Sequence, residues 1–215
     1  MRKFTTLFAL FLTLLTLPIL AQPSDCALTA SNSEGPYYLP GAPFRTEIAP
    51  QGAAGQPLHV SGAVYASDCQ TPLPGAIIDI WQADASGNYD FSDDYLYRGR
   101  VETDETGSYT FDTVPPGNYS AGNALRPAHI HIKVFYHDEE LLTTQIYFAD
   151  DPANTQDGLF DSSLIMPVSA ASDDPALQGA FDFVLDAPPT TNTSPSGFLA
   201  RLLERLREIL SDPQF

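Results

Sequence analysis

Positive charge is scarce in this chain of 215 residues. It contains 10 Lys and Arg against 27 Asp and Glu, which gives a formal net charge of −17 at pH 7. A surface this acidic repels phosphate backbones and anionic lipid headgroups, and it favours solubility. The composition therefore argues against nucleic acid and the membrane surface as partners.

Cysteine is also scarce, since only Cys26 and Cys69 occur. Two cysteines so far apart give little support to a thiolate zinc site. In an oxidising compartment they predict a disulfide, which would attach the N-terminal arm (residues 22–56) to the first core strand (residues 58–66). Such a bond contributes roughly 2–4 kcal/mol of stability. Two unpaired thiols are the alternative.

Long apolar runs are confined to the N-terminus. Residues 7–20 carry no charge, Arg2 and Lys3 precede them, and the small Ala21 follows. This pattern is typical of a signal peptide, here residues 1–21, and the run is short for a membrane span. We therefore expect export to the periplasm or the cell exterior, without membrane insertion once the signal is removed. An uncleaved N-terminal anchor is the alternative.

Helical periodicity is missing from the middle of the chain. Residues 57–187 consist of short alternating or apolar runs separated by Pro, Gly, Asn and Asp, which indicates an all-β, antiparallel β-sandwich domain rather than an α/β fold. The expected strands are residues 58–66, 76–82, 97–103, 108–113, 128–136, 141–148 and 180–185.

Three further segments surround this domain. Residues 22–56 are rich in Pro, Gly, Ala and Ser and predict an N-terminal arm laid over it, and residues 188–197 predict an exposed linker. Residues 198–211 have helical periodicity with one apolar seam, which predicts a short C-terminal amphipathic helix. This helix could dock on its own domain, form a homodimer or contact a partner.

A His-x-His pair is the first candidate for chemistry. In a strand, His129 and His131 share one face, whereas the isoleucines that follow each of them face the other way. Two buried imidazoles on one face predict half of a metal site, because each would otherwise need its own polar partner. A cupin-like site would require a glutamate followed by a further histidine, but His137 precedes both Glu139 and Glu140.

Tyr89 and Tyr119 are candidates for the other half of the site. A phenol must lose a proton of pKa about 10 to bind a metal, so a highly charged, hard cation such as ferric iron is the fitting partner. One Fe(III), two tyrosinates, one hydroxide and two neutral imidazoles have no net charge. Such a neutral cluster is far less costly to bury than a charged one.

Six segments carry a family resemblance. They read IWQADASGNY at 80–89, GRVETD at 99–104, GSYTF at 107–111, PGNY at 116–119, RPAHIH at 126–131 and TQIYF at 144–148. In this combination and order, the chain resembles the intradiol ring-cleavage dioxygenases over roughly residues 34–152. Protocatechuate 3,4-dioxygenase and catechol 1,2-dioxygenase belong to that family, and the export signal is similar to its secreted branch.

The resemblance implies a metal centre and an activity. It implies a prealbumin-like β-sandwich that holds non-haem Fe(III) through Tyr89, Tyr119, His129 and His131. It also implies that Tyr89 stays bound while Tyr119 leaves when a catechol binds. The implied reaction is cleavage of the catechol by O2 to a cis,cis-muconate-type diacid.

The resemblance also assigns residues around the metal. It places Arg126 and Gln145 beside the reacting ring, and it places Gly35, Pro36 and Tyr37 in the wall of the substrate pocket. For Arg126 the alternative is a surface ion pair that caps the strand, and for residues 35–37 it is plain packing. The acidic composition mildly disfavours an anionic substrate such as protocatechuate and favours neutral catechols.

Two other functions compete with this interpretation. The chain could be a non-catalytic secreted binding module of the prealbumin-like type, although such a module has no use for the complete set of two tyrosines, two histidines and one arginine. It could also be a zinc- or copper-binding protein that uses His129 and His131, with the tyrosines incidental.

Overall fold

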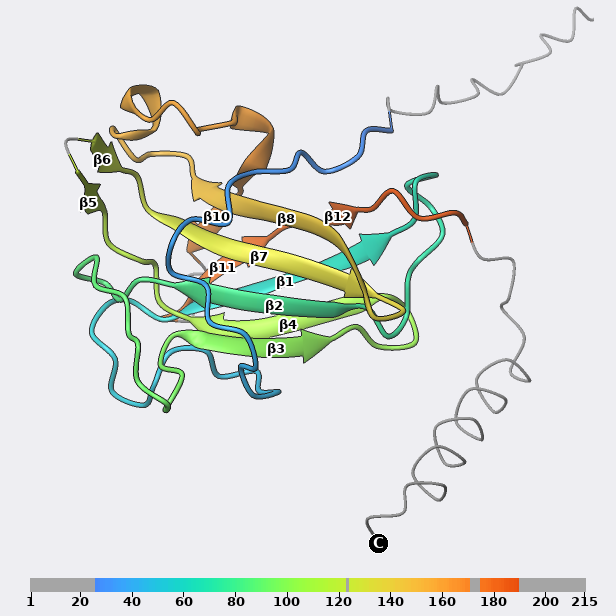
Figure 1. Cartoon of the computed structure of the whole chain (residues 1–215), viewed down its shortest axis with the longest axis horizontal. Helices are drawn as coiled ribbons and strands as arrows, with labels where there is room; N and C mark the ends of the chain where they lie inside the picture. Colours follow the sequence, from blue (N-terminus) through green and yellow to red (C-terminus); the bar gives the residue numbers. More distant parts are fainter. Residues whose placement is uncertain (1–25, 123, 171–174, 190–215) are drawn as a thin grey trace, which may run out of the picture.

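The computed structural model describes residues 26–122, 124–170 and 175–189 (Figure 1). The predicted signal peptide, the predicted C-terminal helix and residues 190–197 of the predicted linker lie outside these ranges. Within them, no helix has both the length and the apolar character needed to cross a membrane.

Two five-stranded sheets form the body of the described chain. The first contains, in spatial order, β10 (Val168–Ala170), β11 (Leu177–Ala180), β1 (Leu58–Tyr65) and β12 (Phe183–Val184), with β4 (Ser108–Thr113) paired to β1. The second runs β3 (Arg98–Glu102), β2 (Ile77–Gln82), β7 (His129–Tyr136), β8 (Glu139–Phe148) and β9 (Ile165–Met166). A separate hairpin joins β5 (Tyr119–Ala121) to β6 (Ala124–Arg126), and two 3₁₀ turns, η1 (Asn154–Gln156) and η2 (Ser162–Leu164), follow β8.

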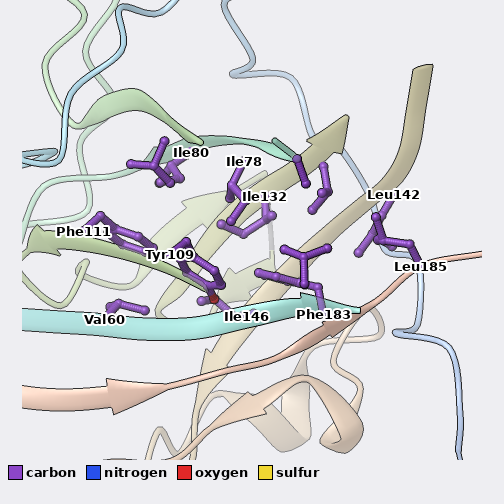
Figure 2. Packing of buried hydrophobic residues seen from close by; sticks show 14 of the residues in the cluster. Val60, Ile78, Ile80, Tyr109, Phe111, Ile132, Leu142, Ile146, Phe183 and Leu185 are labelled. Carbon is purple, nitrogen blue, oxygen red and sulfur yellow. The ribbon is translucent and has the colours of Figure 1, made fainter. Parts of the chain in front are cut away.

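The two sheets share one apolar core. Val60 and Phe111 from the first sheet and Ile80 and Ile132 from the second are completely buried in it (Figure 2). Because strand side chains alternate, β7 directs its isoleucines into this core and its histidines to the opposite face of the sheet. The expected all-β fold is confirmed. The face of the second sheet that points away from the core carries the two histidines.

The purely antiparallel arrangement that we expected is wrong, because both sheets are mixed. β1 pairs in parallel with β11 and β12, and β8 pairs in parallel with β9. A parallel neighbour needs a long crossover connection, and residues 149–164 provide one between β8 and β9. The expected strand at 180–185 is also interrupted at Asp182, whose side chain accepts a hydrogen bond from the Ala63 backbone at 2.8 Å.

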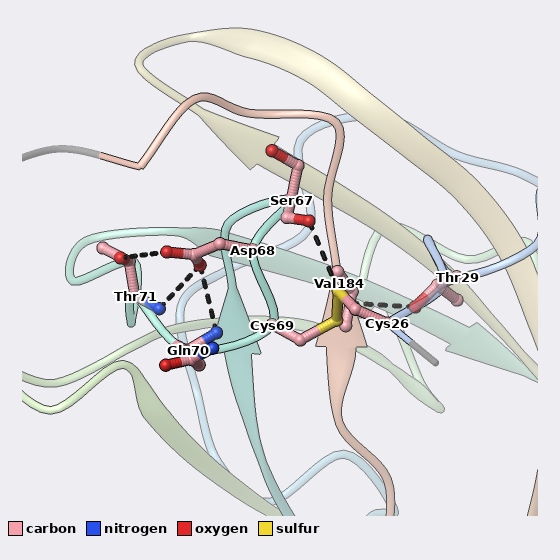
Figure 3. The surroundings of a disulfide bond; sticks show 8 residues. All are labelled: Cys26, Thr29, Ser67, Asp68, Cys69, Gln70, Thr71 and Val184. Atoms are coloured by element: carbon pink, nitrogen blue, oxygen red, sulfur yellow. Dashed lines mark hydrogen bonds between the residues drawn. A yellow bond between two sulfur atoms is a disulfide. The ribbon is translucent and has the colours of Figure 1, made fainter. Parts of the chain in front are cut away.

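The N-terminal arm is fastened to the domain at several points. Cys26 and Cys69 form a disulfide with a Cα–Cα distance of 5.8 Å, next to the turn that follows β1 (Figure 3). The Asp68 carboxylate holds that turn by accepting the Gln70 and Thr71 backbone N–H groups at 3.0 and 2.8 Å. Further along, the arm donates from the Asn32 backbone to the Thr143 carbonyl of β8 at 2.9 Å. These contacts bring residues 33–38 to the outer face of the second sheet.

Candidate metal centre

Two imidazoles face one another on the outer side of β7. His129 and His131 are 2% and 0% exposed, and their Nε2 atoms lie 3.1 Å apart. The Pro127 carbonyl lies 2.7 Å from His129 Nδ1 and can only accept, so Nδ1 carries the hydrogen and Nε2 keeps its lone pair. Two nitrogens bound at right angles, each about 2.1 Å from one ion, are about 3.0 Å apart. The pair therefore fits two adjacent positions around one metal.

Both histidines are neutral at physiological pH. Burial, and secondarily the charge of Arg126, lower the pKa of His129 to about 4. Burial and the neighbouring His129 hold the pKa of His131 well below its ordinary value. A neutral imidazole offers the lone pair that a metal requires.

The two predicted tyrosines lie against these histidines. The rings of Tyr89 and Tyr119 meet edge to face with centroids 5.4 Å apart. Tyr119 lies 5.6 Å from the His129 ring, and Tyr89 lies 6.2 Å from the His131 ring. The structure thus brings together all four side chains that the sequence analysis named as ligands.

Two buried polar atoms in this cluster have no hydrogen-bond partner among the described residues. They are Tyr89 Oη and His131 Nδ1. Burial, reinforced by the adjacent Tyr119, raises the pKa of Tyr89 above its ordinary value. A buried hydroxyl without a partner is costly, and coordination to a highly charged cation would remove that cost by taking the phenolate form. The donor set therefore fits ferric iron.

A close approach of two loops positions the tyrosines. Asp84 folds the loop after β2 by accepting the Ser86 and Asn88 backbone N–H groups at 2.8 and 2.9 Å, which directs Tyr89 inward. A Cβ on Gly87, whose φ is +85°, would lie 2.2 Å from the Asn118 carbonyl oxygen. Only glycine allows the Tyr89 loop to pack so closely beside Tyr119.

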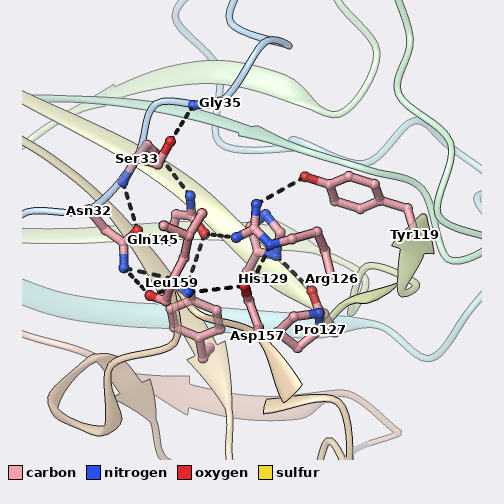
Figure 4. Close-up of polar contacts among 12 residues, drawn as sticks. Asn32, Ser33, Gly35, Tyr119, Arg126, Pro127, His129, Gln145, Asp157 and Leu159 are labelled. Atoms are coloured by element: carbon pink, nitrogen blue, oxygen red, sulfur yellow. Dashed lines mark hydrogen bonds and ion pairs between the residues drawn. The ribbon is translucent and has the colours of Figure 1, made fainter. Parts of the chain in front are cut away.

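Arg126 lies inside this site and is not the exposed capping group of the alternative interpretation. It is 6% exposed and forms an ion pair with Asp157 at 2.8 Å (Figure 4). Its guanidinium also donates to Gln145 Oε1 at 2.6 Å and to Tyr119 Oη at 3.4 Å. The planar guanidinium is therefore fixed on three sides, with one edge toward Tyr119.

Gln145 is held by contacts that link the arm to β8. Its Nε2 donates to the Ser33 carbonyl at 2.6 Å, and its Oε1 accepts from the Tyr147 hydroxyl at 2.9 Å. Asn32 in turn approaches Tyr147 Oη at 3.5 Å. The arm is thus part of the site.

The arm also covers the candidate metal ligands. Tyr37 stacks on Tyr89 with ring centroids 4.1 Å apart and meets Tyr119 edge-on at 5.6 Å. Gly35 has a φ of +70°, and a Cβ added there would lie 3.2 Å from His131 Cε1. The segment that includes Pro36 therefore lies directly over the cluster.

Sequence reasoning missed three residues of this site. Trp81 stacks on His131 with centroids 4.8 Å apart, Tyr147 lies 5.7 Å from the His129 ring, and Asp157 pairs with Arg126. Tyr147 follows Gln145 by two residues in a strand, so alternation alone could have placed it on the same face. The other two depend on strand register and on an irregular loop, for which the sequence carries no local signal.

Residues 33–187 match the model of the protein family described as "Dioxygenase". The chain belongs to the intradiol ring-cleavage dioxygenase family. The match covers residues 33–56 of the arm and both sheets, including the two tyrosines, the two histidines, Arg126 and Gln145.

Individual members of the family show the same similarity. The chain is 32% identical over 168 residues to the intradiol ring-cleavage dioxygenase prcA of Aspergillus niger, covering 67% of this chain and 53% of that protein. It is 33% identical over 168 residues to a chlorocatechol 1,2-dioxygenase of Rhodococcus opacus, covering 66% and 65%. The chain thus spans about half to just under two thirds of these relatives' length.

A solved structure is similar to this chain over most of its length. The dioxygenase domain of a dioxygenase carbohydrate-binding protein fusion from Streptomyces sp. SirexAA-E is 42% identical to it, with a TM-score of 0.69. The alignment covers 75% of this chain and 100% of that domain. The two-sheet fold of this intradiol-family chain is therefore that of a known dioxygenase domain.

Proposed function

We propose that this protein uses O2 to cleave a catechol between its two hydroxyl-bearing carbons and forms a cis,cis-muconate-type diacid. Non-haem Fe(III) would be held by Tyr89, Tyr119, His129 and His131. The observation that carries this proposal is the convergence of two phenols on two facing imidazole nitrogens that are 3.1 Å apart.

Ferric iron suits the site because its ligands are hard, and two of them become anions. When bound, Fe(III) would stabilise both phenolates and draw electron density from a catechol, so that a ring carbon becomes reactive toward O2. The neutral imidazoles add no charge, which keeps the buried cluster close to electrically neutral.

The two tyrosines have different surroundings, and these support different roles. Tyr89 Oη makes no hydrogen bond of good geometry among the described residues, although the Tyr119 hydroxyl is close enough to raise its pKa. Tyr37 stacks on the Tyr89 ring, so Tyr89 is placed to remain a ligand. Tyr119 Oη already accepts a hydrogen bond from Arg126 at 3.4 Å. Tyr119 can therefore take a proton from the incoming catechol and withdraw to a partner that is already in place.

Arg126 is placed to stabilise negative charge that develops on the ring. Asp157 and Gln145 fix its guanidinium before the reaction, so little reorganisation is needed. A preorganised donor of this kind supplies about 2.7–4 kcal/mol in other enzymes. The arm residues above the cluster would exclude water during the reaction.

Iron content, colour and oxygen uptake test this proposal together. We expect purified protein to bind ferric iron, to show a broad visible tyrosinate charge-transfer band and to consume O2 with catechol. Colourless protein fully loaded with zinc or copper and inactive toward catechols would support the metal-binding alternative. Colourless protein that resists iron loading would support the binding module.

The substrate is best sought among catechols. The named activities of the relatives include catechol, chlorocatechol and chlorohydroxyquinol 1,2-dioxygenases and a protocatechuate 3,4-dioxygenase. Oxygen uptake across unsubstituted, halogenated, hydroxylated and carboxylated catechols would rank these classes, and chromatography would identify the diacid product.

We also propose that the protein is exported to the periplasm or the cell exterior. The N-terminal pattern of residues 1–21 supports export, and the Cys26–Cys69 bond suits an oxidising compartment. N-terminal sequencing of protein collected outside the cytoplasm should find a mature chain beginning near Gln22. A chain that still begins at Met1 and stays with the membrane would indicate an uncleaved anchor.

A further inference from the structure

The only cation that touches Tyr119 among the described residues is neutralised by a buried carboxylate. The side chains of Arg126 and Asp157 are 8% and 5% exposed, and Nε lies 2.8 Å from Oδ2 (Figure 4). Asp157 lies in the crossover between β8 and β9, just after η1. It therefore reaches Arg126 from outside the strands that carry the proposed ligands.

Two other cations on this face of the sheet, Lys133 and Arg98, are paired or buried. Lys133 Nζ lies 2.7 Å from both Glu34 and Glu140. Arg98 donates to the Asp90 carbonyl at 2.8 Å, whereas its Nε and Nη1 have no partner among the described residues. Arg98 is 1% exposed, so burial keeps the guanidinium away from a ligand. No free positive charge is thus presented to a substrate by these three side chains.

A second carboxylate lies near His129. Asp151 accepts the Ala128 backbone N–H at 2.7 Å and the Asn118 side chain at 3.1 Å, which places it next to the strand that carries His129. Asp151 and Asp157 together give this end of the site two negative charges against the single charge of Arg126. The local charge is therefore negative.

Exposed apolar side chains also occur near these groups. Phe91 is 58% exposed, and its ring lies 5.8 Å from that of Tyr37. Leu159, which is 43% exposed, follows Asp157 by two residues. Exposed apolar side chains favour uncharged, apolar ring substituents.

We infer that Asp157 is a specificity-determining residue, which neutralises and orients Arg126 so that the site takes uncharged catechols and discriminates against carboxylated ones. This inference rests on the proposed function. A substrate carboxylate would lose its hydration on entry and find no unpaired cation to replace it. The ion pair with Asp157 also orients the Arg126 guanidinium toward Tyr119.

The wild-type protein provides the first test. We expect kcat/KM for catechol and 4-methylcatechol to exceed that for 3,4-dihydroxybenzoate by roughly tenfold or more. Dissociation constants from anaerobic visible titrations of the iron-loaded protein should show the same order. Equal or tighter binding of 3,4-dihydroxybenzoate would overturn the inference, whereas absence of oxygen uptake with every catechol would instead overturn the proposed function.

An isosteric substitution provides the second test. Asp157→Asn keeps an oxygen that can accept from Arg126 Nε but removes the negative charge. The ratio of the two dissociation constants should shift toward 3,4-dihydroxybenzoate by roughly tenfold or more, with iron content unchanged. The exposed Asp150→Asn makes the same change in net charge and should leave the ratio unaltered.

The two variants separate a local effect from a global one. An equal shift in both would mean that net charge alone acts, and no shift in Asp157→Asn would mean that its carboxylate plays no part in selectivity. Either result contradicts the inference. If Asp157→Asn does not fold, the wild-type preference decides.

Discussion

Tyr37 and Tyr89 stack on one another with ring centroids 4.1 Å apart and an interplanar angle of 20°. Tyr37 belongs to the N-terminal arm, whereas Tyr89 follows β2 and is the proposed ligand that stays bound. An element outside the two sheets therefore helps to hold the proposed metal site.

Tyr89→Phe should remove the proposed iron–phenolate bond while keeping the ring that Tyr37 covers. We expect most of the visible band to disappear. Mutation of a residue that only hydrogen-bonds to a metal ligand typically lowers activity by roughly 10–100-fold, and loss of the ligand itself should lower turnover by more than that. Absorption spectra, iron content and oxygen uptake would measure this. Tyr95→Phe is the control, because the Tyr95 hydroxyl donates instead to the Pro40 carbonyl at 3.1 Å. The reverse pattern would show that Tyr95 is the ligand.

Arg126→Ala should keep iron and colour but lower kcat by roughly 10²–10³-fold, because a preorganised donor beside the ring is lost. It should also lower the free energy of unfolding by about 3–5 kcal/mol, since Asp157 stays buried without its partner. Steady-state oxygen uptake and urea unfolding measure the two effects. Arg126→Lys keeps the charge without the planar fork, so an intermediate kcat is expected. Wild-type kcat in Arg126→Ala would remove this residue from the reaction.

Gly35→Ala should weaken iron binding. The alanine would have to keep the left-handed φ of +70° that Gly35 has, and its Cβ would lie 3.2 Å from His131 Cε1. Gly52→Ala is the matched control, because its φ is +79° and nothing lies within 4 Å of its added Cβ. Both variants should lose about 1–2 kcal/mol of stability from the left-handed backbone. Only Gly35→Ala should lose iron affinity, measured by competition with a chelator; equal affinities would mean that His131 tolerates the contact.

Asp79 should make stability depend on pH. This carboxyl is 3% exposed, and burial raises its pKa from 3.8 to about 6, although Tyr38 donates to it at 2.9 Å. The folded protein holds this proton more tightly than the unfolded chain does, so the contribution to stability is complete below about pH 4 and falls as pH rises through 6.

Asp79→Asn removes this titration. Relative to wild type, the variant should therefore gain on the order of 2–3 kcal/mol of unfolding free energy between pH 4 and pH 7. Urea unfolding at the two pH values measures the difference. Asp150→Asn, at an exposed position, should show no such gain. A wild type that is stabilised relative to Asp79→Asn as pH rises would contradict the assignment.

Local patterns predicted the parts of the site that lie within single strands. Alternation along β7 was enough to place His129 and His131 on one face, and turn residues marked most strand boundaries. The parallel pairing of β1 with β11 depends on contacts more than 100 residues apart, as the register Leu58–Leu177 shows, and no local pattern encodes it. Asp157 is likewise brought to Arg126 by an irregular crossover, and the stack of Trp81 on His131 depends on the register between β2 and β7.

The disulfide bears on the compartment in which the proposed metal site would be enclosed. The segment that covers the proposed ligands begins a few residues after Cys26. The covalent bond between Cys26 and Cys69 therefore restricts the conformations that this segment can sample before it packs on the sheet. In a reducing cytosol the same segment would be retained by non-covalent contacts alone, and water would reach the imidazoles more often. With the proposed export, oxidation outside the cytoplasm would complete the enclosure of the proposed metal site and would make its metal retention depend on that compartment.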